Sequence, residues 1–276
     1  MTAVSNVHVH SRWCDGLNTI TEMTEAAIRL GFSDIGFSSH SAVSFDPEFH
    51  GISCYEGYRE EIYTLNERYA GQINLLCGIE QDMLSEIDRS LFDYIILSAH
   101  YFRPKDGRID TIDSSPEQLE ATFRERFGGN GIDMAEDNFS FIADEVKKRK
   151  PDIVGHYDVI TKFNKNMRFF DETGKAYQDT ALAYLDEIID CTAGYGGMIE
   201  INTSGMRYKE TGYPYAGTPF MLKRMLERKA RVIITADSHE TVYLNYKYDE
   251  AAELLRANGF KTMTVLKDRK FQDIPV

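Results

Sequence analysis

Short β-rich segments alternate with amphipathic helical segments along almost the whole chain, and this alternation limits the fold more than any other feature. Apolar runs rich in Val, Ile and Tyr predict eight strands, at residues 4–10, 34–40, 73–80, 93–100, 152–158, 197–204, 231–239 and 261–266. Helical patterns lie between them, at residues 19–30, 55–70, 116–127, 133–149, 176–193, 218–229 and 248–258. Strands that alternate with helices predict a parallel sheet built from βαβ units. Seven or eight such repeats favour a closed α/β barrel over an open sheet.

The length and composition are typical of one globular domain. The chain has 276 residues, of which 42% are hydrophobic and 27% are charged, and this suits a single barrel domain over residues 1–276. No run of about 18 apolar residues predicts a membrane span. The first residues lack the basic and apolar segments of a signal peptide, so we expect a cytoplasmic protein. The formal net charge of -13 argues against broad binding to nucleic acid, which requires a basic surface.

Most of the histidines fall at or just past the end of a predicted strand. The six that do so are His8, His10, His40, His100, His156 and His239. The seventh, His50, lies in the loop FDPEFHG, and we interpret it as a surface or substrate-side residue without assigning it a metal role. The carboxyl ends of parallel strands converge on one face of a barrel, where active sites are built. The pattern therefore predicts that six imidazoles meet there.

Three carboxylates accompany these histidines. Glu80 closes the apolar run INLLCGIE as its lone acid, and an unpaired buried carboxylate is costly unless a cation faces it. Asp15 lies in the loop after the first strand, and Asp237 precedes His239 by two residues, a spacing that puts both side chains on one strand face. One ion takes four to six ligands, so nine candidates fit two or three ions that share bridging carboxylates. The lack of a thiolate in the set leaves Zn, Mn or Fe open.

The ordered motifs HVH with a following Asp, SSH, GIE, SAH, GHYD and ADSH resemble the polymerase and histidinol phosphatase (PHP) superfamily, from His8 to His239. The stretches GHYDVITKFN (155–164) and EINTSGMR (200–207) look more narrowly like its histidinol-phosphate phosphatase branch. The resemblance implies a distorted (β/α)7 TIM-like barrel, with three divalent metal ions (Zn, Mn or Fe) at the C-terminal ends of the strands. Carried across by motif, it assigns His8, His10, Glu80 and Asp237 to the first metal, Glu80, His100 and His156 to the second, and Asp15, His40 and His239 to the third.

The charge of such a centre suits a phosphate monoester. Three divalent ions, offset by three carboxylates and a bridging hydroxide, leave roughly +2 to face a phosphate dianion. We expect that metal-bridging hydroxide to attack phosphorus in line. The resemblance implies that the substrate is L-histidinol phosphate, which would be cleaved to L-histidinol and phosphate in histidine biosynthesis.

Other side chains are candidates for binding and proton transfer. Arg207, after the NTSG turn, is the first candidate for a phosphate clamp, because a guanidinium can bind two oxygens at once. Lys162 and Arg103 are the second and third candidates. Asp158 would share a strand face with His156 if that strand continued, which makes it the candidate proton donor to the leaving alcohol.

Three alternatives stay open at this point. Another PHP phosphoesterase would act on a nucleotide or a different small phosphate ester. An amidohydrolase-type C–N hydrolase also opens with HxH, but the pair of Asp237 and His239 and the early Glu80 favour a phosphatase. A third alternative is an accessory PHP domain that is attached to a DNA polymerase. We expect this chain to have neither the room for a polymerase nor a basic surface.

Overall fold

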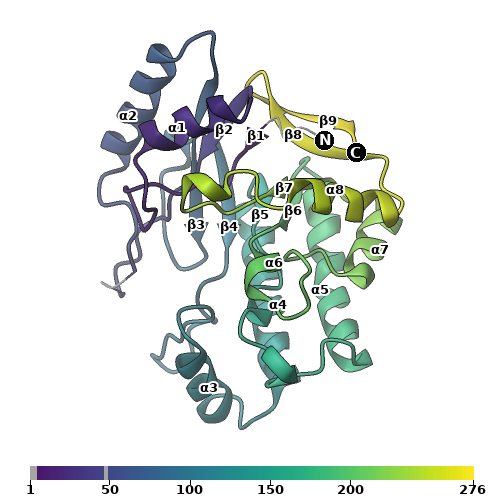
Figure 1. Cartoon of the computed structure of the whole chain (residues 1–276). Coiled ribbons are helices and arrows are strands. Elements are labelled where there is room, and N and C mark those ends of the chain that lie inside the picture. Colours follow the sequence, from purple (N-terminus) through teal and green to yellow (C-terminus); the bar gives the residue numbers. More distant parts are fainter. Residues whose placement is uncertain (1–4, 47–48) are drawn as a thin grey trace.

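A curled sheet of nine strands forms the centre of the computed structural model, which describes residues 5–46 and 49–276 (Figure 1). In order across the sheet, the strands are β1 (Ser5–Asn6), β2 (Asp34–Phe37), β3 (Asn74–Asp82), β4 (Tyr94–Ser98), β5 (Ile153–Val154), β6 (Met198–Asn202), β7 (Val232–Thr235), β8 (Thr262–Lys267) and β9 (Lys270–Pro275). Neighbours from β1 to β8 pair in parallel, and β9 runs antiparallel to β8. The order follows the chain, as βαβ repeats require.

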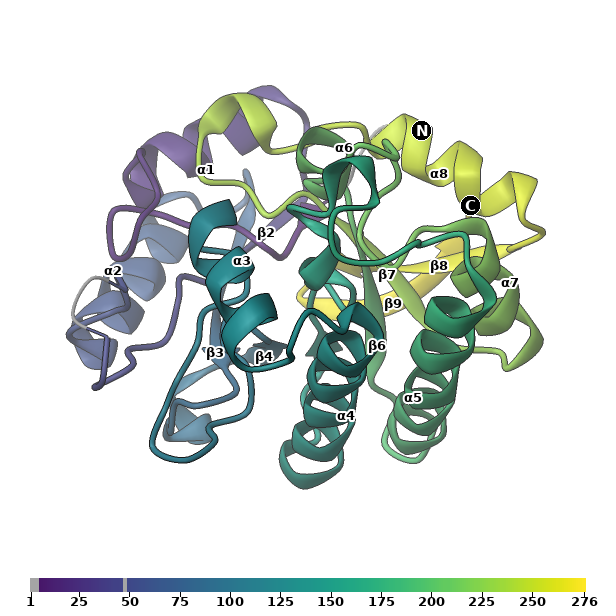
Figure 2. The same ribbon diagram turned by 90° about the horizontal axis from the view of Figure 1, so that it is seen from below.

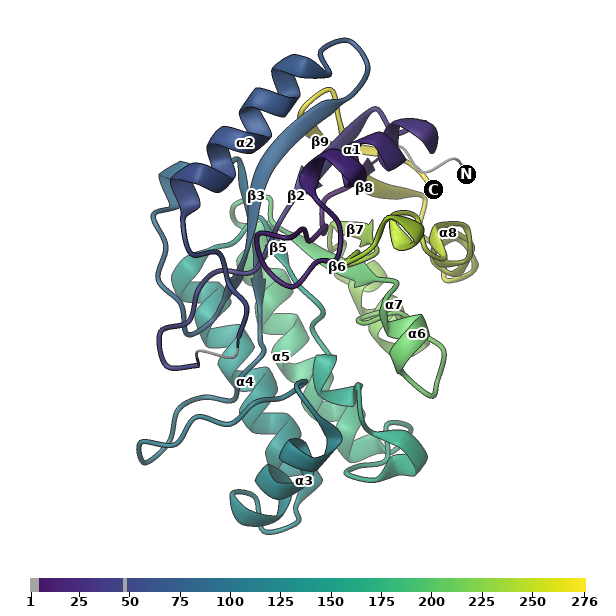
Figure 3. The ribbon, with the colours of Figure 1, turned by 60° about the vertical axis from the view of Figure 1, so that its left-hand side comes forward.

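Helices connect most of these strands. They are α1 (Ile20–Arg29), α2 (Tyr55–Arg68), α3 (Pro116–Glu125), α4 (Gly131–Arg149), α5 (Lys175–Ala193), α6 (Gly205–Tyr208), α7 (Pro219–Glu227) and α8 (Tyr248–Ala257). The longer helices cover the outside of the sheet, whereas α3 and α6 contribute residues to the rim of a cavity. Figures 2 and 3 show α4 and α5 side by side along one flank, with α3 beyond them. The start of α1 is a capping box, in which Thr19 and Glu22 satisfy each other's free backbone N–H groups.

The sheet closes where residues 8–10 pass between the ends of β2 and β7. On one side, Ser38 N donates to Val9 O at 2.8 Å. On the other side, His10 N donates to Ser238 O at 2.8 Å and Ser238 N donates to His8 O at 3.0 Å. The expected α/β class and the TIM-like barrel are therefore confirmed in coarse form, and the closure brings an early segment against a late one.

Tyr94 fills the barrel interior. Its side chain is buried, and its hydroxyl donates to Val7 O at 2.6 Å. Gly36 and Gly78 make the room, because a Cβ added at either would overlap the Tyr94 side chain. Apolar side chains from several strands pack around it, including Ile96. The interior is thus packed, as in other barrels of this kind.

Two predicted strands are reduced to two residues each. The strand expected over 4–10 is regular only at Ser5–Asn6, and its first residue lies outside the described part of the chain. The strand expected over 152–158 ends at Val154, and a 3-10 turn follows at Val159–Thr161. Strand β9 was not expected at all. Among the described residues, no helix combines the length and apolar character that crossing a membrane would require.

Candidate functional site

Glu80 lies at the centre of the site, at the C-terminal part of β3. Its side chain is buried, and its two oxygens face five imidazole rings. The contacts run from Oε2 to His8 Nε2 (3.2 Å), His10 Nε2 (3.4 Å) and His40 Nδ1 (2.9 Å), and from Oε1 to His100 Nε2 (3.5 Å) and His156 Nε2 (2.9 Å). Together, the two oxygens therefore face ring nitrogens from the ends of four strands, two strands for each oxygen.

Asp237 completes the set on the β7 side of the barrel. Its Oδ1 lies 3.2 Å from His10 Nε2 and 3.6 Å from both His8 Nε2 and His239 Nδ1. Asp237 has a φ of 48°, a left-handed backbone conformation that residues other than glycine rarely adopt. Such conformations recur at functional sites. The turn after β7 thus aims this carboxylate at the imidazoles.

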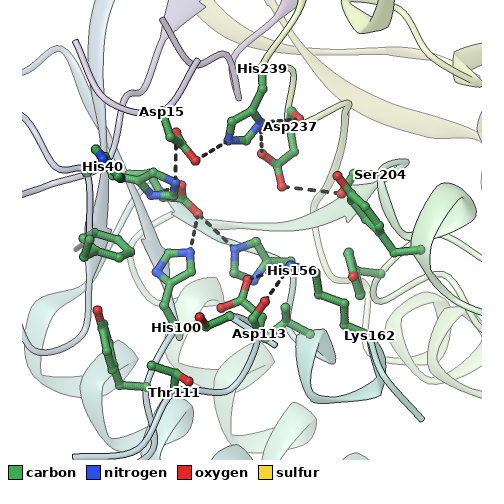
Figure 4. Close-up of a pocket in the computed structure, with 18 of the residues that line it drawn as sticks. Asp15, His40, His100, Thr111, Asp113, His156, Lys162, Ser204, Asp237 and His239 are labelled. Carbon is green, nitrogen blue, oxygen red and sulfur yellow. Dashed lines mark hydrogen bonds and ion pairs between the residues drawn. The ribbon is translucent and has the colours of Figure 1, made fainter. Parts of the chain in front are cut away.

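Asp15 lies in the loop between β1 and α1, beside His239 (Figure 4). Its Oδ2 lies 3.2 Å from His239 Nε2, and its Oδ1 lies 3.6 Å from His40 Nε2 and 3.7 Å from His10 Nδ1. All nine residues that the sequence singled out therefore meet in one place. Three overlapping groups keep their ligand atoms within 4.8 Å of one another, namely His10, Asp15, His40 and His239; His8, His10 and Glu80; and His40, Glu80 and His100.

The free atoms of this cluster suit divalent cations. His8 Nε2, His10 Nε2, His40 Nδ1 and Glu80 Oε2 are buried and have no hydrogen-bond partner among the described residues. Buried polar atoms are normally paired, so a group of unpaired ones that face each other needs an explanation. Imidazole nitrogens and carboxylate oxygens without a thiolate are the donors that Zn, Mn and Fe accept. The residues present therefore fit bound metal ions.

The electrostatics of the cluster keep its acids ionised and one imidazole neutral. Burial opposes ionisation of Glu80, but the charges of His8 and His40 outweigh it and hold the pKa of that carboxyl well below its usual range. Desolvation by burial, followed by repulsion from His239 and His40, lowers the pKa of His10 to about 3. Glu80 and His10 are therefore in the forms that bind metals. Burial alone would lower the pKa of His8, His40 and His239, but the neighbouring carboxylates outweigh it and raise all three pKa values, so these imidazoles would release a proton when a metal ion binds.

Two buried carboxylates that the sequence reasoning missed stand behind the histidines. Asp82 Oδ2 lies 3.2 Å from His100 Nδ1 and also accepts from His100 N. Glu200 Oε1 lies 2.5 Å from His8 Nδ1. The sequence pattern that identified Glu80, an acid within an apolar strand, was also present for Glu200, which lies in the run MIEIN of β6.

A cavity of about 710 Å³ opens over the cluster, and two of the predicted phosphate-binding cations line it. Arg207 stacks on the rings of Tyr243 and Tyr208, with its Cζ 4.1 Å and 4.6 Å from their centroids, and it donates to the Tyr208 hydroxyl at 2.6 Å. Lys162 Nζ donates to Asp113 O at 2.9 Å and to Asp113 Oδ2 at 3.2 Å. Figure 4 places Lys162 and Ser204 across the cavity from His40.

The structure does not bring the other two predicted residues into the cavity. Arg103 donates to Asp144 at 2.7 Å and lies over the ring of Phe141. Asp158 is fully buried and accepts from Lys209 Nζ at 2.6 Å. Its expected place on a strand face with His156 does not exist, because β5 ends at Val154. The loop residue His50 does line the cavity, at an exposed position.

Comparison with known proteins places these residues in a family context. The PHP domain family matches residues 6–204 of the chain. The histidinol-phosphatase of Bacillus subtilis is 26% identical and covers 89% of this chain and 97% of its own length. A protein of Schizosaccharomyces pombe named probable histidinol-phosphatase is 24% identical, over 94% of this chain and 88% of its own.

A solved structure shares the fold. The histidinol phosphate phosphatase of Lactococcus lactis, crystallised with zinc, L-histidinol and phosphate, superposes with a TM-score of 0.71. The match covers 97% of this chain and 98% of that one at 18% sequence identity. At this identity the likeness concerns the arrangement of the chain.

Proposed function

The chain belongs to the PHP domain family, and from that premise we propose that it is a metal-dependent phosphomonoesterase that hydrolyses L-histidinol phosphate to L-histidinol and phosphate. The observation that carries the proposal is the buried cluster around Glu80, where nine ligand candidates meet beneath a cavity with two cationic side chains. Two relatives named as histidinol-phosphatases, each matched over most of its length, support the substrate.

Three divalent ions, of Zn, Mn or Fe, would occupy the cluster. The first would be held by His8, His10, Glu80 and Asp237, the second by Glu80, His100 and His156, and the third by Asp15, His40 and His239. Two features of the overlapping donor groups support this division: Glu80 belongs to two of them, and Asp15, His40 and His239 share the third. His156 and Asp237 are assigned from their contacts with Glu80 and His10. When bound, such ions stabilise negative charge on phosphoryl oxygens and lower the pKa of water toward neutrality.

Arg207 and Lys162 would bind the phosphate oxygens from the cavity wall. The two tyrosine rings hold the guanidinium of Arg207 in one plane, which suits contact with two oxygens at once. Lys162 is held by Asp113, and its remaining donor capacity can reach the cavity that it lines. Arg103 and Asp158 have no part in this proposal, because their side chains are bonded elsewhere.

The rest of the cavity suits a cationic leaving alcohol. Asp46, Asp113 and Glu240 line it together with several aromatic rings. Tyr101 donates to Asp46 Oδ2 at 2.7 Å, which fixes an acid and a ring side by side. The amine and imidazole of histidinol require acidic and aromatic partners of this kind.

The whole chain, residues 1–276, would act as one domain. Strands β1 to β7 would form the (β/α)7 barrel with the metal site at their C-terminal ends. Strand β8 pairs with β7 and lies against β1, where Leu266 N donates to Ser5 Oγ, and β9 pairs with β8. The tie between the segment after β1 and the turn after β7 supports this arrangement, because it joins the first and seventh strands.

Turnover of a substrate panel tests the proposal. Purified metal-replete protein should hydrolyse L-histidinol phosphate with a kcat/KM well above that for p-nitrophenyl phosphate, a nucleoside monophosphate and a phosphodiester. Equal rates for histidinol phosphate and the aryl phosphate would reject the specific substrate and favour another small phosphate ester. Absence of any phosphatase activity in metal-replete protein would reject the reaction itself.

A further inference from the structure

Glu200 is a buried carboxylate beside the cluster that is not among the proposed ligands. It belongs to β6 and has no exposed surface. Its Oε1 lies 2.5 Å from His8 Nδ1 and accepts from Thr235 Oγ1 at 2.6 Å. Its Oε2 accepts from His156 N at 2.6 Å and from Asn202 Nδ2 at 3.1 Å. A carboxylate offers about four lone-pair positions, and four donors occupy them here, so Glu200 has none left for a metal ion.

We propose that Glu200 is a positioning residue that fixes the tautomer and the ring orientation of His8. A proton shared with Glu200 must sit on His8 Nδ1, which leaves the lone pair on Nε2. That atom points to Glu80 Oε2 at 3.2 Å and Asp237 Oδ1 at 3.6 Å. A carboxylate behind a ligating histidine commonly orients the ring and raises its basicity. The inference rests on the metal centre of the proposed function.

The same carboxylate reaches two further ligand segments. Asn202 Nδ2 donates both to Glu200 Oε2 at 3.1 Å and to Asp237 Oδ2 at 3.2 Å. The backbone N–H of His156 donates to Glu200 directly. Glu200 thus ties the segments after β1, β5 and β7 to β6, and loss of its charge should disturb more than one metal ligand.

Glutamine keeps the shape of Glu200 but cannot replace its acceptors. If the amide oxygen of the substituted side chain faced His8 and Thr235, its NH₂ would oppose the N–H groups of His156 and Asn202. In the reverse orientation the NH₂ would donate to His8 Nδ1. The His8 proton would then move to Nε2, the atom that should hold the metal. Either arrangement weakens the site without removing volume.

Metal affinity of the Glu200→Gln variant tests the inference. Zinc dissociation constants, measured by competition with a chromophoric chelator, should rise roughly 10- to 100-fold against the parent. The matched control is Asp34→Asn, at the opposite end of the sheet. Asp34 is equally buried and accepts from Asn74 Nδ2, Asp268 N and Arg269 N at 2.9–3.1 Å. This control should unfold at a lower temperature than the parent while its zinc affinity stays unchanged.

A double-mutant cycle separates positioning from general weakening of the fold. In a His8→Ala background, Glu200→Gln should cost less zinc affinity than it does in the parent, because only its contacts with His156 N and Asn202 remain to be lost. An equal loss in both backgrounds would overturn the inference, as would parental affinity in Glu200→Gln. If the parent itself binds no metal, the proposed metal centre fails instead.

A measurement on the parent protein covers the case in which Glu200→Gln does not fold. Nitrogen-15 NMR of the zinc-loaded protein, with His8 assigned by comparison with His8→Ala, should show a protonated Nδ1 and a zinc-bound Nε2. A His8 signal with protonated Nε2 would overturn the assignment of Glu200.

Discussion

Replacement of Lys209 by methionine decides whether Asp158 is a buried anchor or a proton donor. Lys209 Nζ and Asp158 Oδ2 are 2.6 Å apart, and both side chains are 1% exposed. The other oxygen, Asp158 Oδ1, accepts from Ala216 N at 2.6 Å. Residues 205–216, which carry Arg207, are thereby fastened to the turn that follows β5.

Lys209→Met leaves the Asp158 carboxylate buried with no cation beside it. Removing one partner of a buried pair costs about 3–5 kcal/mol, whereas replacing both partners is often nearly neutral. In chains of a similar length, each kcal/mol shifts Tm by about 2–4 °C. The single variant should therefore unfold roughly 6–20 °C below the parent. Adding Asp158→Asn should recover most of that loss.

Thermal unfolding and steady-state kinetics on these variants separate the two roles. We expect the double variant to keep a kcat of the same order as the parent, because neither side chain lines the cavity. A proton donor would behave differently, since its loss typically lowers kcat about 10²- to 10⁴-fold. The surface pair of Lys175 and Asp179 is the control, and Lys175→Met should leave Tm nearly unchanged. A stable double variant without activity, or an unchanged Tm in Lys209→Met, would refute the reasoning.

Three further results are expected. Elemental analysis with anomalous diffraction should find three metal ions near the nine ligand residues, and a single ion would contradict the three-ion assignment. Arg207→Ala should lower kcat/KM for histidinol phosphate about 10- to 100-fold, which corresponds to the loss of a charged hydrogen bond. Arg207→Lys should recover little of this loss, because a lysine lacks the planar guanidinium. Full recovery in Arg207→Lys would argue for a simple charge effect. Gly78→Ala should destabilise the fold by about 1–3 kcal/mol through overpacking, because the alanine Cβ would overlap the Tyr94 ring. A free energy of unfolding in urea equal to that of the parent would exclude this overlap.

Periodicity predicted the helices and the parallel sheet well, but not the ends of the strands that carry the site. The predicted helix at 133–149 and the observed α4 differ by two residues at one end. The apolar run at 152–158 looked like a full strand, yet pairing stops at Val154 because the next residues turn to direct His156 at Glu80. The final strand was missed because KFQDIP mixes polar and apolar side chains without a buried face.

The meeting of the candidate ligands could be predicted because the carboxyl ends of parallel strands converge whatever the exact fold. The carboxylates that hydrogen-bond to the candidate ligands could not be predicted, because their roles depend on contacts between segments far apart in sequence. Glu200 and His8, for example, are separated by 192 positions. The expected position of Asp158 beside His156 depended on a continued strand, so the error in that strand end also gave a wrong position for Asp158.

The closure of the barrel has a kinetic consequence. His8 and His239 stand near opposite ends of the chain, yet their backbones meet through the hydrogen bonds between residues 8–10 and Ser238. Pairings between such distant positions form slowly, because a long loop must close before the contact is gained. During synthesis, the segment with His8 leaves the ribosome long before the segment with Asp237 and His239. With the ligands proposed above, tight metal loading would await the emergence of β7, and a nascent chain that ended earlier would carry an open ligand set.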